Sequence, residues 1–126
     1  MKYLQTDFSS DLNELINTTE HSFYEHSKLL LSEYADLCVK RDRKLTIEVE
    51  KYGKDPFMPG YVSIISVIIK REKDKIKIVG PIWKCQRTFF GIQLSKNLPG
   101  SKVSGELITL QDTGNVFKEF IEDNLK

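Results

Sequence analysis

Cysteine is scarce in this chain, and its two cysteines are far apart. Cys38 and Cys85 fall in different predicted elements and form no CxxC pair, which is the spacing of many zinc and thiol redox motifs. The sequence therefore speaks against a disulfide framework or a cysteine-rich metal centre. We expect two free thiols in or near the core, as in a reducing compartment. A disulfide between them is the alternative.

Residues that build catalytic and metal sites are also few. The only histidines are His21 and His26, and HExxH is absent. His21 lies one helical turn from Glu25, but no third ligand follows at helical spacing. GxSxG, a GxGxxG loop and a P-loop are absent too. Glu48 and Glu50 lie on one predicted strand, where we interpret them as surface residues rather than paired catalytic acids. We predict no catalytic residue, no metal and no cofactor.

Long apolar segments are missing as well. No run of about eighteen apolar residues occurs, so no membrane span is predicted. The first residues, MKYLQTDFSSDL, carry two acids and lack the apolar segment of a signal peptide. We therefore expect a cytoplasmic protein. A length of 126 residues favours one domain that spans 1–126.

The N-terminal third shows a helical pattern from about residue 9 to 40. Candidate N-caps lie within 7–10. Most inward positions repeat at steps of three or four: Leu12, Leu15, Ile16, Thr19, Phe23, Ser27, Leu30, Tyr34 and Leu37 or Cys38. Residues 17–19 are poor helix formers, so a short helix followed by a longer one from about 19 is the alternative. One continuous helix would be about 45 Å long. We expect its ends to project beyond a small sheet or to pack on a second copy.

Strand patterns occupy the middle of the chain. Residues 45–52 alternate apolar and polar, and 61–70 are apolar on both faces, which is typical of a central strand. A charged turn at 71–74 leads into a strand that Gly80-Pro81 should interrupt, through a bulge or at a sheet edge. It resumes over 82–94, and 103–110 is the last predicted strand.

A short helix that begins at Asp112 or Asn115 ends the chain. Short connections between strands favour antiparallel neighbours. The predicted fold is α+β: a mostly antiparallel sheet of four to five strands, with a long N-terminal helix and a short C-terminal helix packed on it.

Charge is unevenly distributed although the net charge is only +1. Residues 70–102 carry a net charge of +7, and each flank carries −3. We predict that binding residues lie in this basic stretch: Lys70, Arg71, Lys73, Lys75, Lys77, Lys84 and Arg87. On a shared face they would suit phosphates or an acidic protein surface. Alternatively, these lysines keep a hairpin soluble and protect a sheet edge.

The loop at 53–60 offers an apolar contact. Phe57 and Met58 lie between two prolines, which would present them stiffly to a partner. Trp83 is the third apolar contact that we predict. The alternative is that Phe57 folds back over the core.

These patterns predict a small non-catalytic protein-binding module of the adaptor or inhibitor type. The partner is another protein, or a second copy that packs against the long helix. The alternative is a nucleic-acid-binding accessory protein that uses the basic strands within 70–102. An enzyme of unassigned class is the third hypothesis.

Overall fold

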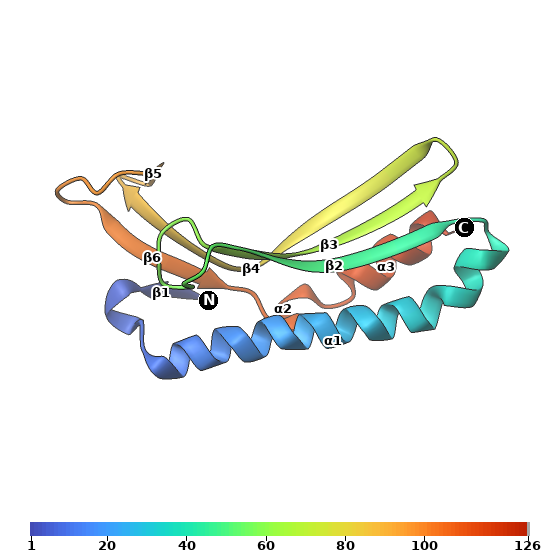
Figure 1. Ribbon diagram of the computed structural model, residues 1–126, viewed down its shortest axis with the longest axis horizontal. Helices are drawn as coiled ribbons and strands as arrows, with labels where there is room; N and C mark the ends of the chain where they lie inside the picture. Colours follow the sequence, from blue (N-terminus) through green and yellow to red (C-terminus); the bar gives the residue numbers. More distant parts are fainter. Residues whose placement is uncertain (126) are drawn as a thin grey trace.

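The computed structural model describes residues 1–125 as an α+β fold (Figure 1). A sheet of six strands packs against a long N-terminal helix and short C-terminal helices. The elements in chain order are β1 (Lys2–Leu4), the 3-10 helix η1 (Gln5–Asp7), α1 (Ser10–Lys40), β2 (Lys44–Tyr52), β3 (Val62–Arg71), β4 (Asp74–Phe89), β5 (Ile92–Leu94), β6 (Lys102–Leu107), α2 (Leu110–Thr113) and α3 (Val116–Asn124). Lys126, the last residue of the predicted domain, lies outside the described residues.

Helix α1 is continuous over 31 residues. The Ser9 side chain caps it by accepting a hydrogen bond from the Leu12 backbone N–H at 3.1 Å. The predicted inward stripe is confirmed at eight positions: Leu12, Ile16, Thr19, Phe23, Ser27, Leu30, Tyr34 and Cys38. It is wrong at Leu15, which is 43% exposed, and it misses Glu20, which is 2% exposed.

The sheet is antiparallel, with strand order β1-β6-β4-β3-β2 and with β5 paired to β4. The strand predicted as central is β3, an interior strand between β2 and β4, and a two-residue turn links it to β4. Strand β1 was not predicted. The stretch predicted as one strand over 82–94 is divided at Phe90-Gly91, where both residues have positive φ angles and β5 folds back on β4.

Strand β4 is continuous past Gly80-Pro81, and the predicted interruption takes the form of a bulge. Ser63 faces Trp83 while Ile64 faces Pro81, so Ile82 is one extra residue. The bulge reverses the alternation of faces. As a result the neighbours Ile82 and Trp83 are both fully buried.

All helices cover one face of the sheet (Figure 1). The core beneath them has two parts, one around Phe23, Ile65 and Phe117 and the other around Ile16 and Trp83. Both ends of the sheet bend away from α1, and no segment within residues 1–125 covers the opposite face, which we call the outer face (Figure 1).

The sheet is as long as the helix that it covers. Strand β4 has 16 residues, a length of roughly 50 Å, and buried side chains line α1 from Leu12 to Cys38. The expectation that the helix ends project is therefore wrong. No helix within residues 1–125 combines the length and apolarity needed to cross a bilayer.

Candidate binding site at the basic end of the sheet

Three lysines lie side by side where β2, β3 and β4 meet the turn end of the sheet. Lys70 faces Lys44 on one side and Lys75 on the other. Lys70 follows the core residue Ile69, so all three side chains point to the outer face. Facing side chains on neighbouring strands have Cβ atoms about 4.5–5.5 Å apart, and like charges at that distance repel. Within residues 1–125, no acid forms an ion pair with any of the three.

Two arginines lie at the same end, on the side of the sheet that faces α1. Arg43 and Arg71 line a pocket of about 440 Å³ together with the turn residues Glu72, Lys73 and Asp74. The Arg43 guanidinium donates to the backbone oxygens of residues 41 and 42 at 2.8 and 3.3 Å. In both arginines Nε is buried and donates to no acceptor among the described residues. These two N–H groups therefore lack a hydrogen-bond partner within residues 1–125.

We call this group the basic end: Arg43, Lys44, Lys70, Arg71, Lys73 and Lys75. The C-terminus of α1 lies beside it, and its helix dipole stabilises nearby positive charge. That effect accounts for basic residues close to Lys40. It does not account for the lysine row, which lies on the outer face.

The other predicted basic residues do not join the basic end. Lys77 lies two residue pairs further along the sheet, where the hydrogen bond from Tyr52 and, to a lesser extent, the charge of Lys77 lower the pKa of Glu50. Lys84 lies near the opposite end and faces Glu106 on β6. Arg87 donates to Asn97 and Ser101 at 3.1 and 3.2 Å, which ties it to the loop after β5.

The predicted apolar contacts are largely part of the core. Trp83 is fully buried, and its indole N–H donates to the Pro56 carbonyl at 2.7 Å. Phe57 is half-buried and stacks on Phe8 with ring centroids 4.6 Å apart. This matches the alternative in which Phe57 folds back. Only Met58 remains at the surface, 59% exposed.

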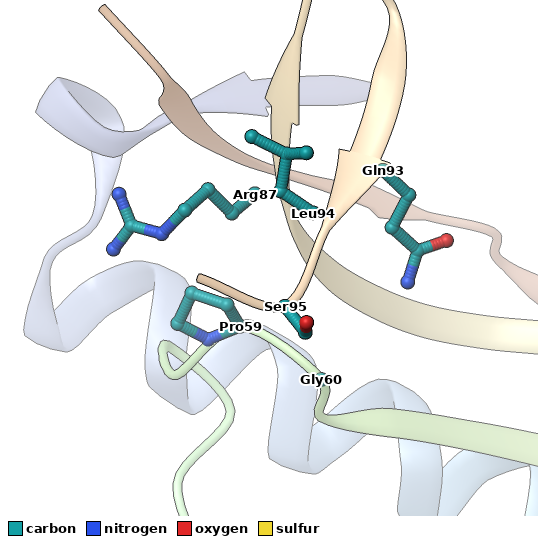
Figure 2. A pocket seen from close by; sticks show the side chains of 6 residues that line it. All are labelled: Pro59, Gly60, Arg87, Gln93, Leu94 and Ser95. Atoms are coloured by element: carbon teal, nitrogen blue, oxygen red, sulfur yellow. The ribbon is translucent and has the colours of Figure 1, made fainter. Parts of the chain in front are cut away.

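A larger pocket, of about 510 Å³, lies between the 53–60 loop and β5. Figure 2 shows that Arg87 and Gln93 extend to opposite sides of it. The hydrogen bonds of Arg87 lead away to the later loop. Because its polar groups do not converge, this pocket does not resemble a site built around one ligand.

The structure also places the histidines and cysteines. His21 Nε2 lies 3.6 Å from Glu25 Oε1 on the exposed side of α1, and the described residues contain no cluster that could hold a metal ion. Cys38 and Cys85 are free and buried, as expected. Burial raises the pKa of Cys85 to about 11, so this thiol is not activated as a nucleophile.

The polar group that the sequence did not indicate is Glu20 on α1. Its carboxylate accepts a hydrogen bond from the Tyr61 hydroxyl at 2.8 Å, in the interior. Burial, and then this hydrogen bond, raise the pKa of Tyr61 well above its usual value. Its position in the sequence could have indicated burial, because Glu20 lies four residues after Ile16 and three before Phe23, on the buried stripe.

Replacing Lys70 with threonine should stabilise the protein, because Lys70 is the middle charge of the lysine row. We expect the free energy of unfolding to rise by about 0.5–1 kcal/mol at low salt, and the gain to shrink as salt screens the repulsion. Urea unfolding at two ionic strengths measures both effects. Lys102→Thr is the control, since Lys102 also lies on a strand but faces Thr88. An equal gain in the control would mean that threonine itself, and not the relief of charge repulsion, raises the stability.

Comparison of the chain with protein-family models, with curated proteins and with solved structures finds no match in any of the three. The function proposed below therefore rests on the geometry of the basic end.

Proposed function

We propose that this chain is a non-catalytic binding module that recognises an acidic segment of a partner protein through the basic end. The observation that carries the proposal is the row Lys44, Lys70 and Lys75, which faces no acid and which we expect to lower the stability of the free protein. An acidic ligand would relieve this repulsion. Arg43 and Arg71, which line the pocket on the α1 side of the same end, add guanidinium groups of the kind suited to carboxylates.

Three features favour a short acidic segment over a nucleic acid. The basic end contains no aromatic residue on which a base could stack. The aromatic residues Tyr61 and Trp83 are buried. Further along the outer face, β2 presents Glu48 and Glu50, which would repel a phosphate backbone that continued along the sheet.

Self-association through α1 stays a separate prediction. The large apolar residues exposed on α1 are Leu15, Tyr24, Leu29 and Val39. They lie at least five residues apart along the helix, and the described structure carries its apolar stripe toward the sheet. Support for the basic end is therefore stronger than support for a helix-mediated dimer.

Charge reversal at the basic end tests the proposal. The ligand is a fluorescent peptide rich in aspartate and glutamate, and binding is followed by anisotropy at low salt. We expect Lys70→Glu with Lys75→Glu to weaken binding about a hundredfold, because two attractive charges become repulsive. Binding of the unaltered protein should weaken as salt rises.

The matched control is Lys96→Glu with Lys102→Glu, which changes net charge equally but lies at the other end of the sheet. We expect it to change affinity less than about threefold, as for distant exposed charges. Equal losses in both variants would mean attraction to overall charge, against the proposal. Tighter binding of single-stranded DNA of equal charge would favour the nucleic-acid alternative. A protein that ignores the peptide at low salt would refute the proposal.

A further inference from the structure

A second polar site, unrelated to the basic end, lies midway along α1. Its centre is Glu20, whose side chain is 1% exposed. The two carboxylate oxygens differ in their surroundings. Oε2 accepts the hydrogen bond from Tyr61, whereas Oε1 is buried and accepts from no donor among the described residues. A buried carboxylate oxygen without a donor is costly.

Lys51 on β2 partly compensates this charge. Its ammonium nitrogen is 3.6 Å from Glu20 Oε1, which makes an ion pair but leaves the oxygen without a hydrogen bond. The Lys51 side chain is 55% exposed. It can therefore move into solvent and leave the carboxylate accessible to another donor.

Glu20 and Lys51 line a pocket of about 230 Å³. The remaining lining residues are Asn17, His21, Tyr24 and Val49. The Tyr24 ring already holds a cation, since the Lys28 ammonium lies 4.5 Å from its centroid. The pocket thus combines a buried carboxylate, one oxygen of which accepts no hydrogen bond among the described residues, with an aromatic rim. Carboxylates and aromatic rings are the two features that bind ammonium and guanidinium groups.

We propose that this pocket binds a guanidinium or ammonium group, with Glu20 Oε1 as its acceptor and Lys51 as the internal cation that it displaces. The group comes from a free amine or from an arginine or lysine side chain of another protein. The site does not depend on the basic end, from which it differs in charge and in the ligand that it binds.

The test uses the full-length protein and agmatine, followed by NMR chemical shifts. We expect saturable shifts at the pocket residues with agmatine and none with butanol at the same concentration. Lys51→Met should bind agmatine about tenfold more tightly, because the internal competitor is gone, and Glu20→Gln should bind it about tenfold more weakly. Tyr24→Ala changes only an exposed rim and should weaken binding about threefold while the fold stays intact.

Several results would overturn the proposal: shifts that never saturate, equal shifts with butanol, or unchanged affinity in Lys51→Met. If Glu20→Gln does not fold, the affinities of Tyr24→Ala and Lys51→Met for agmatine test the proposal. A short peptide with one arginine identifies the source. Binding tighter than that of agmatine indicates a protein side chain, and the reverse indicates a free amine.

Discussion

Gly105→Ala should be among the most destabilising single changes in this protein. The expected cause is overpacking, because the six-membered ring of Trp83 lies directly against Gly105. A Cβ atom at this position would lie 2.9 Å from Cζ3 of Trp83, and closer still to Cη2 and Cζ2. Trp83 cannot move aside, since it is fully buried, packs between Phe8 and Tyr3, and hydrogen-bonds to Pro56.

We expect the free energy of unfolding to fall by about 3 kcal/mol or more, at the upper end for overpacked cores. Urea unfolding measures the loss. For a domain of this size, it corresponds to a drop in Tm of roughly 10 °C or more. Ser104→Ala on the same strand is the control, because Ser104 points to the outer face. If both variants lose the same stability, the close packing of Trp83 on Gly105 is not what limits this position.

Tyr61→Phe should cost nearly as much, although it removes a single oxygen atom. The hydroxyl of Tyr61 is the only hydrogen-bond donor to the buried Glu20 carboxylate within residues 1–125. Without it, both carboxylate oxygens would lack a hydrogen bond. Only the ion pair with Lys51 at 3.6 Å would remain, and leaving a buried charge without a hydrogen bond costs about 3 kcal/mol.

Tyr52→Phe is a closely matched control, because the Tyr52 hydroxyl also donates to a glutamate, Glu50, but at the exposed edge of the sheet. We expect a loss below about 0.5 kcal/mol there, since water replaces the lost donor. Urea unfolding of both variants gives the comparison. Adding Glu20→Gln to Tyr61→Phe should recover part of the loss, because the charge is gone. Equal costs for the two tyrosines would show that Glu20 does not depend on Tyr61.

The architecture was predictable because apolar periodicity directly reflects which face is buried. The apolar stripe on α1 predicted the helix, and apolar residues on both faces of β3 predicted an interior strand. Strand β1 could not be predicted, since three residues carry too little periodicity and β1 pairs with β6 from the far end of the chain. The length of α1 was predictable as well. Whether the sheet extends along the whole helix depended on the length of β4.

The candidate site was less predictable, for two physical reasons. Which face a lysine occupies beyond a bulge depends on the extra residue, so Lys84 shares the outer face with Lys77 although their spacing alone suggests opposite faces. Which charges become neutralised depends on strand order, and this order places Glu106 beside Lys84 but no acid beside Lys70. Glu20 was missed because an acid on a helix is usually assigned to solvent.

The extra residue in β4 also links the two parts of the core directly along the backbone. Because Ile82 and Trp83 are consecutive and anchor different halves of the interior, the covalent backbone joins those halves without any intervening linker. Helix α1 crosses the same boundary between Ile16 and Phe23. Strand β4 and helix α1 are therefore both continuous across the boundary between the two halves.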